Sequence, residues 1–262
     1  MGWRIGQIVL ATGIVALVVA MGGRFELGPG GSRSGAWAEA SPGPVRWTPP
    51  RERGSVKSTL SGGRRGEMAS TCSAANSANS TTLTLLVPQE RAGLLTTSEQ
   101  PTFFWHISTE QAIAVEFLLS HPDVAEPIYT QRHWVNRGGI VSLSLAADIE
   151  LEVGTRYRWT ILATCPEGTA QEIYARSFIE RVHHESLEQN VPGQSRFGQA
   201  IAYAAAGIWY NALEAIIQAH QYEPHNAEVR AGLESLLGQA VVDRVGSEPW
   251  GEVPIFSQES HL

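Results

Sequence analysis

Three carboxylates at alternating positions form the first pattern in the chain that could do chemistry. Asp148, Glu150 and Glu152 are each followed by an apolar residue, so in an extended strand all three would point to one face. Together with loop carbonyls they could bind calcium. A glycosidase would need a second carboxylate across a cleft, and the sequence shows no such partner. A solvated strand edge is the favoured interpretation.

The histidines offer a second pattern. The segment from His183 to Glu188, His-His-Glu-Ser-Leu-Glu, has part of the spacing of a zinc-protease helix. However, Glu188 occupies the position where a second histidine would complete the ligand pair. His220 and His225 flank a proline and have no third ligand nearby. We therefore interpret these histidines as surface residues and expect no metal.

Missing residue types exclude further chemistries. Lys57 is the only lysine and lies before the foldable part, which removes Schiff-base chemistry. There is no Gly-x-Ser-x-Gly elbow, and no Gly-rich stretch joins a strand to a helix, so neither a serine hydrolase elbow nor a phosphate cradle is expected. We predict a non-enzymatic protein with no catalytic residue and no cofactor. A hydrolase with a site assembled from dispersed acids is the less favoured alternative.

The segment from His133 to Asn136 holds the candidate binding residues. Its sequence, His-Trp-Val-Asn, falls between two predicted strands. An exposed tryptophan there could stack on a sugar or a peptide. We therefore expect Trp134, with His133 and Asn136, to bind a ligand, and carbohydrate or cell-wall binding is the alternative function. Trp105 and Trp159 are expected in the core instead.

Residues 1–38 have the pattern of a secretory signal peptide. Arg4 precedes an apolar run at 8–21, which is shorter than the roughly 20 residues that span a bilayer. Ala36-Trp37-Ala38 is the expected cleavage site. Because the gap before it is long and Gly-rich, cleavage near Ala20 or retention as a membrane anchor stays open. We expect a periplasmic or secreted protein.

Cys72 and Cys165 are the only cysteines. In an exported chain an even number suggests a disulfide. Two free thiols, or half of a metal site, are the alternatives, and no nearby spacing of His or Cys supports the second. We favour the disulfide.

Charge separates a basic linker from an acidic folded part. Residues 39–70 are rich in Pro, Gly, Ser and Arg, which predicts a disordered linker. Residues 39–66 carry a net charge of +4, whereas 10 arginines and 23 acidic residues from Glu67 onward give −13. The acidic part argues against nucleic acid. The linker is expected to be a solvated tether rather than a contact for an anionic surface, and Trp47 a lone exposed aromatic rather than an anchor.

Seven short strands are predicted within residues 71–182. Breakers rather than helices separate them, which indicates a sandwich or barrel. In residues 155–165 the alternation places Trp159 on the inner face, with Arg156 and Arg158 on the other. We predict a mainly β chain with a seven-stranded antiparallel sandwich. The strands at Pro101 to Trp105 and Gly154 to Trp159 resemble those of fibronectin type III modules, which implies a sandwich of immunoglobulin or fibronectin type III type. The strands are 82–87, 102–107, 113–120, 127–131, 139–146, 155–164 and 172–182.

Residues 193–245 change to a helical period, and residues 246–262 are expected to be irregular. Gly207 and Pro224 separate three short amphipathic helices, and Asn226 is suited to the N-cap of the third. This tail is a helical hairpin or three-helix segment. Its apolar stripes must dock on the sandwich or on a partner, and the sandwich is favoured.

Several motifs follow one another in a fixed order along the chain, namely Gly62 to Arg65, Cys72, Leu83 to Pro88, Ser98 to Trp105, Gly139 to Leu143, Leu151 to Trp159, Cys165 and Gly207 to Leu213. In this order they resemble the cyanobacterial domain of unknown function family numbered 928. The similarity covers most of residues 62–240. The resemblance implies an exported protein without an established activity, so no catalytic residue is carried over.

The helical tail is more weakly similar to one tetratricopeptide repeat, through Ala200, Tyr203, Gly207, Ala212, Ala219 and Pro224. Such repeats usually need three or more copies to bury their faces. The leading expectation is therefore an extracytoplasmic, non-catalytic binding or scaffolding module. Its expected partner is another protein of the cell envelope, and it would contact the membrane only if the signal is retained.

Overall fold

The computed structural model describes six parts of the chain: residues 45–50, 69–72, 81–88, 94–165, 172–240 and 255–258. The chain divides into two compact units, Met1–Ser41 and Pro42–Leu262, and the description below concerns the second. The predicted signal peptide, most of the predicted linker and most of residues 246–262 lie outside the described residues.

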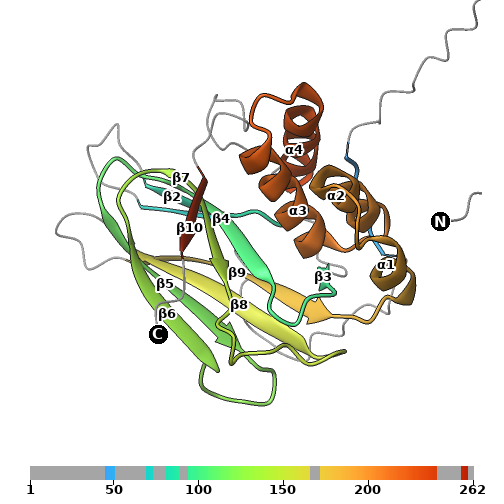
Figure 1. The fold of residues 1–262 in the computed structure, drawn as a ribbon. Coiled ribbons are helices and arrows are strands. Elements are labelled where there is room, and N and C mark those ends of the chain that lie inside the picture. The colour runs from blue at the N-terminus through green and yellow to red at the C-terminus, as the bar shows by residue number, and fades with distance from the viewer. Residues whose placement is uncertain are drawn as a thin grey trace, which may run out of the picture. The chain divides into compact units, whose positions relative to one another are not determined.

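Ten strands of the described residues form two five-stranded sheets (Figure 1). Sheet A has the order β1-β2-β4-β7-β10, and sheet B has the order β3-β9-β8-β5-β6. The strands of sheet A are β1 (Ala69–Thr71), β2 (Thr82–Leu85), β4 (Thr102–Ser108), β7 (Gly139–Ser144) and β10 (Ile255–Gln258). Those of sheet B are β3 (Leu95–Thr96), β9 (Glu172–Arg181), β8 (Arg156–Thr164), β5 (Ile113–Ser120) and β6 (Tyr129–Val135).

The prediction of a mainly β chain with C-terminal helices is confirmed. Each of the seven predicted strands has a counterpart, in β2 and in β4 to β9. The seven-stranded antiparallel arrangement is not confirmed, because β1, β3 and β10 add to the sheets. Two of these, β3 on β9 and β10 on β7, pair in parallel.

Aromatic side chains from both sheets meet in the core. The Phe103 ring of sheet A lies 4.9 Å from the Phe117 ring and 5.1 Å from the Trp159 ring of sheet B. Alternate residues of β8 are buried, so the predicted inner face of this strand is confirmed. The predicted disulfide between Cys72 and Cys165 is also confirmed, and its Cα atoms lie 5.8 Å apart.

Among the described residues, four helices follow the last long strand and gather beside the sheets (Figure 1). They are α1 (Glu185–Asn190), α2 (Arg196–Ala205), α3 (Trp209–Tyr222) and α4 (Ala227–Ala240). Gly207 separates α2 from α3 with a φ of +80°, a conformation that suits glycine. The Asn226 side chain accepts hydrogen bonds from the backbone N–H groups of Glu228 and Val229 at 3.0 and 3.3 Å, so it caps α4 as predicted. Helix α1 was not predicted.

Helices α2, α3 and α4 belong to the same hydrophobic core as the sheets, whereas Leu187 of α1 lies in a second, smaller cluster with Leu95 of β3. The apolar stripe of α3 is buried, and its Trp209 indole N–H donates to the Leu86 carbonyl at 3.0 Å. The buried residues of α4 include Val229, Leu233 and Leu236. The tail therefore docks on the two sheets, as the favoured of the two interpretations expected.

Residues 45–50, expected to be part of the linker, pack against these helices. Trp47 is 6% exposed, and its ring lies 5.6 Å from the Trp209 ring in an edge-on contact. The backbone N–H of Thr48 donates to the Ala204 carbonyl at 3.0 Å. The expectation of an exposed Trp47 is wrong, because the missing side chain of Gly207 leaves room for this segment. A Cβ at Gly207 would lie 2.8 Å from the Thr48 carbonyl oxygen.

In the part of the chain that the structure describes, no helix has the length and apolar character needed to cross a membrane.

Candidate functional site

The predicted binding residues lie on and beside an edge strand. His133 and Trp134 belong to β6, which continues to Val135, and exposed Asn136 follows it. The expectation that all of them lie between strands is therefore wrong for His133 and Trp134. The reason is pairing, since β6 remains in register with β5 up to the pair Ile113 and Val135.

Alternation along β6 separates Trp134 from His133. Trp134 is 66% exposed, whereas the His133 ring turns inward and lies 5.7 Å from the Trp105 ring. Both His133 ring nitrogens are buried, and neither has a hydrogen-bond partner among the described residues. Burial lowers the pKa of His133 to about 4, so the neutral ring is a core group. The two residues therefore do not form one binding site.

The acidic residues of the 148–152 segment are exposed in the connection between β7 and β8. The Glu152 carboxylate accepts a hydrogen bond from the Thr155 hydroxyl at 3.4 Å, and its backbone N–H donates to the Tyr157 hydroxyl at 3.1 Å. Within the described ranges, no group of three or more His, Cys, Asp or Glu residues is arranged to hold a metal ion.

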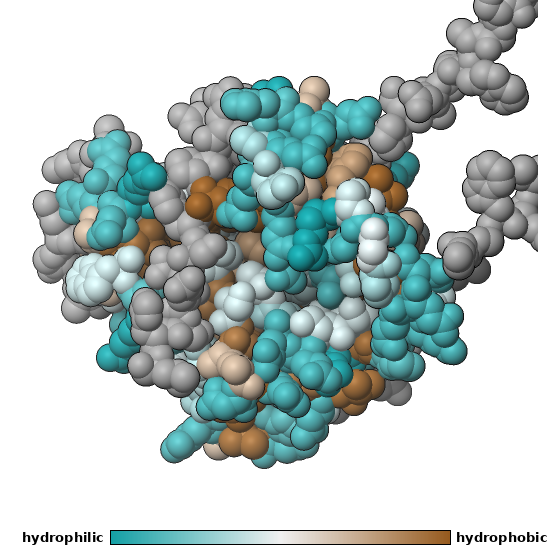
Figure 2. All heavy atoms as spheres, in the orientation of Figure 1, coloured by the Kyte–Doolittle hydropathy of each residue, from teal (hydrophilic) through white to brown (hydrophobic). Residues whose placement is uncertain are grey.

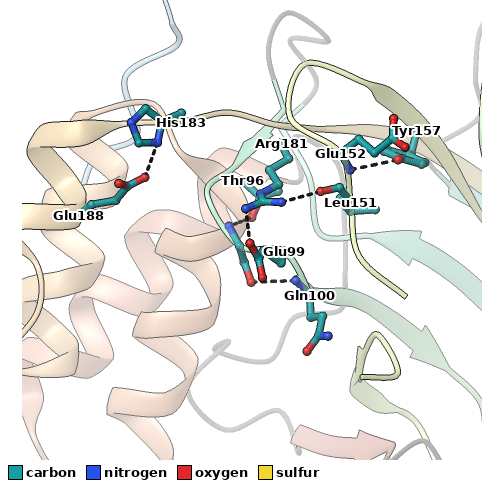
Figure 3. A network of polar contacts seen from close by, with 10 residues as sticks. Thr96, Glu99, Gln100, Leu151, Glu152, Tyr157, Arg181, His183 and Glu188 are labelled. Atoms are coloured by element: carbon teal, nitrogen blue, oxygen red, sulfur yellow. Dashed lines mark hydrogen bonds and ion pairs between the residues drawn. The ribbon is translucent and has the colours of Figure 1, made fainter. Parts of the chain in front are cut away.

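Arg181, at the end of β9, holds three chain segments together (Figure 3). Its guanidinium lies 2.6 Å from a Glu99 carboxylate oxygen and donates to the Leu151 carbonyl at 2.8 Å. In the same region His183 Nδ1 lies 2.8 Å from a Glu188 carboxylate oxygen, so the two residues of the zinc-like motif contact each other. We interpret both contacts as structural, because each connects neighbouring segments of the fold.

Buried polar side chains of α3 attach this helix to both sheets. The Tyr210 hydroxyl accepts from the Trp159 indole N–H at 2.7 Å and donates to the Phe178 carbonyl at 2.8 Å. The Thr102 hydroxyl donates to the Glu214 carboxyl at 2.8 Å. Burial raises the pKa of Glu214, while the hydrogen bond from Thr102 opposes this shift. These groups serve docking of the helix.

The outward-facing residues of sheet B form a broad, partly apolar surface, which we call the sheet B outer face. They are the residues of β5, β6, β8 and β9 that alternate with the buried ones. Trp134 and Phe178 are 66% and 43% exposed on it. Leu118 on β5 and Leu162 on β8 are half-buried apolar side chains between them, and the half-buried Tyr174 lies on β9 with Phe178.

Four arginines lie on this face, and two of them are neutralised. Arg132 pairs with Glu116 at 2.9 Å, and Arg156 pairs with Glu180 at 3.0 Å. The other two are Arg158 and Arg176, and no ion pair with a described residue involves either of them.

The sequence analysis identified only part of this face. It placed Arg156 and Arg158 outward on β8 and Trp134 as a contact residue, but it overlooked the outward residues of β9. Their signal is the alternation of Tyr174, Arg176 and Phe178 with buried residues along β9, which is as regular as that of β8.

The hydropathy of the surface is mixed. In the view of Figure 2, hydrophobic side chains appear as separate patches among hydrophilic ones. Because no single large apolar patch stands out in this view, we use the register of the strands to identify which surface residues are neighbours.

Comparison with known proteins identifies the family and no function. No curated protein matches the chain. A family model described as Domain of Unknown Function (DUF928) matches residues 60–250. This match covers most of the chain, so the protein belongs to the DUF928 family.

Proposed function

We propose that the protein is a non-catalytic binding module that acts outside the cytoplasm, with the sheet B outer face as its contact surface. The observation that carries the proposal is the exposure of Trp134 and Phe178 on a sheet face that also presents half-buried leucines. Tryptophan and other aromatic residues are enriched at binding interfaces, where one ring contributes a large contact area.

The helical tail is a poorer candidate for the contact surface. Trp209 and Tyr210, at the start of α3, are buried against the sheets, and the apolar residues of α4 belong to the same core. The apolar surface that the sequence left without a partner is thus covered within the chain. This supports placing the contact surface on sheet B.

A partner protein fits this face better than a sugar does. Leu118 and Leu162 lie near its centre, on the two middle strands, whereas Trp134 and Phe178 lie toward its two sides. Sugars stack on aromatic rings, while aliphatic side chains suit the apolar residues of a protein. Carbohydrate binding remains the second candidate, and the exposed Trp134 ring on the edge strand β6 favours it.

Two features support an extracytoplasmic location. The chain begins with a signal-like pattern, a basic residue followed by a short apolar run. Its two cysteines form a disulfide, and such bonds persist mainly in oxidising compartments. We place the protein in the periplasm or among secreted proteins.

We also infer a likeness to fibronectin type III modules. Without the short strands β1, β3 and β10, the sheets reduce to the orders β2-β4-β7 and β9-β8-β5-β6. All neighbours in these two reduced sheets pair antiparallel. A sandwich of three and four antiparallel strands supports this classification, which carries no function of its own.

The test is a comparison of two surface variants. The full exported chain would be cross-linked to its neighbours in the cell envelope, either as the native sequence or with Trp134→Ser and Phe178→Ser together. The matched control is Tyr222→Ser, because Tyr222 is an aromatic residue 86% exposed at the end of α3. We expect the double variant to lose a specific cross-linked product that the control retains. Equal products from both variants would contradict the proposed surface.

A further inference from the structure

Arg158 and Arg176 are neighbours on the sheet B outer face. In the register of β8 and β9, Arg158 stands opposite Phe178, and Arg176 stands opposite Thr160. The two arginines are therefore diagonal neighbours, a spacing of about 7–8 Å that long side chains can bridge. Both could contact one acidic group or two adjacent ones.

The surrounding charges do not neutralise this pair. Glu116 and Glu180, which lie on the same face, are each engaged by another arginine. Glu172 lies at the start of β9, opposite Thr164, and four residue pairs along the ladder from the pair of Arg176 and Thr160. The chain carries a net charge of −7, so two adjacent cations that pair with no described carboxylate reverse the sign of the charge locally. Such a local reversal of charge attracts an anionic group.

Arg176 is also held in place. Its guanidinium carbon lies 4.8 Å from the centre of the Tyr174 ring, a cation–π geometry. Its Nε atom is buried and has no hydrogen-bond partner among the described residues. A stacked guanidinium retains its planar arrangement of donors, which matches a carboxylate in a bidentate pair. Less side-chain freedom is lost when such a group binds.

Apolar side chains flank the arginines. Thr160 of β8 stands opposite Leu118 of β5 on one side and opposite Arg176 of β9 on the other, so these three residues form one row across the sheet. Phe178 stands beside Arg158 in the next row. An occupant of this surface must therefore offer carboxylates and apolar side chains together, which an acidic segment of a protein does and an anionic polysaccharide does not.

We propose that the sheet B outer face docks an acidic protein segment, with Arg158 and Arg176 binding its carboxylates and Phe178 and Leu118 contacting its apolar side chains. This inference rests on the proposed function and adds the chemistry of the partner. It assigns the two arginines to recognition and not to stability of the fold.

The probe is a short synthetic peptide that alternates glutamate with valine, and its counterpart carries glutamine in place of glutamate. Binding to the full exported chain would be measured by calorimetry at low and high salt. We expect the glutamate peptide to bind, with an affinity that falls as salt rises. The chain with Arg158→Gln and Arg176→Gln together should bind it about tenfold more weakly. Arg230→Gln is the control, because Arg230 is exposed on α4, and it should bind as the native chain does.

Three results would overturn the inference. They are equal binding of the two peptides, an unchanged affinity in the double arginine variant, and binding of oligogalacturonate in place of the peptide. Near-ultraviolet circular dichroism would verify that the double variant is folded. If the cross-linked product depends on Trp134 and Phe178 but not on the arginines, this inference fails while the proposed function stands. If it depends on none of these residues, both fail.

Discussion

The exchange Tyr210→Phe tests whether the buried contact between α3 and sheet B holds the helical tail on the sheets. Tyr210 is 2% exposed, and burial raises its pKa far above the ordinary value, so the hydroxyl stays protonated. It accepts from the Trp159 indole N–H at 2.7 Å and donates to the Phe178 carbonyl at 2.8 Å. Phenylalanine keeps the ring and removes only the oxygen.

The expected loss follows from the two partners that remain. Trp159 is 0% exposed, so its indole N–H would become an unsatisfied buried donor at a cost of about 1–3 kcal/mol. The Phe178 carbonyl loses one hydrogen bond, worth about 0.5–1.5 kcal/mol. Since the ring still fills its volume, no large cavity term is added. We expect a decrease of about 1.5–4.5 kcal/mol in the free energy of unfolding, a large part of the 5–15 kcal/mol typical of a domain.

Urea denaturation, followed by far-ultraviolet circular dichroism, would measure this loss. The control is Tyr222→Phe, because Tyr222 is 86% exposed, and it should change the free energy of unfolding by less than about 0.5 kcal/mol. A double-mutant cycle with Trp159→Phe isolates the hydrogen bond between the two side chains. A loss below about 0.5 kcal/mol for Tyr210→Phe, or a coupling energy near zero in the cycle, would refute the view that this contact anchors α3.

Three further predictions concern other parts of the fold. Burial lowers the pKa of His106 and of His133 from 6.5 to about 4, so between these pH values the unfolded chain binds more protons than the folded chain. The urea midpoint should therefore fall as the pH is lowered from 6.5 toward 4, and it should fall less steeply in His106→Asn. An equally steep fall in that variant would contradict the lowered pKa of His106. Reduction of the Cys72–Cys165 disulfide should lower the free energy of unfolding by about 4–5 kcal/mol, and an unchanged urea midpoint under reductant would disprove this. Trp47→Ala should cost about 3–5 kcal/mol, whereas a loss below about 1 kcal/mol would mean that residues 45–50 do not stabilise the helices.

The elements that could be predicted are those whose signals are local. Alternation of apolar and polar residues identified the inner face of β8, because one face of this strand is packed against the other sheet. The breaks between helices could also be predicted, because single residues at these positions indicate them. Gly207 adopts a φ of +80°, and the Asn226 side chain caps α4, and both are roles that residue type alone indicates.

The elements that were missed depend on distant partners. Strand β10 pairs with β7, although the paired residues are more than a hundred positions apart in the sequence. No local sequence pattern predicts such a pairing. Residues 45–50 have a composition typical of a linker, yet Val45 and Trp47 are buried. Their burial depends on contacts with α2 to α4. A local sequence pattern cannot predict such contacts, because the surface that buries these residues is formed by segments distant in the sequence.

The candidate site shows the same division. The prediction singled out Trp134 for its residue type, and the structure places it on an exposed edge. It grouped His133 with Trp134 because they are adjacent in sequence, whereas alternation turns neighbours to opposite faces. Arg158 and Arg176 come together only through the register of β8 and β9, so residue types and spacing within one segment could not have joined them.

The anchor of α3 and the proposed docking surface meet at one residue, which connects stability with binding. The backbone carbonyl of Phe178 in β9 accepts a hydrogen bond from the Tyr210 hydroxyl. The side chain of the same residue is 43% exposed and stands opposite Arg158. A surface held rigid before binding loses less conformational entropy when a partner docks. Loosening of α3 should therefore weaken binding at the sheet B outer face even though the partner cannot reach Tyr210. In Tyr210→Phe the affinity for the glutamate peptide should fall under conditions where the chain is still fully folded, and an unchanged affinity would mean that β9 is held by its sheet neighbours alone.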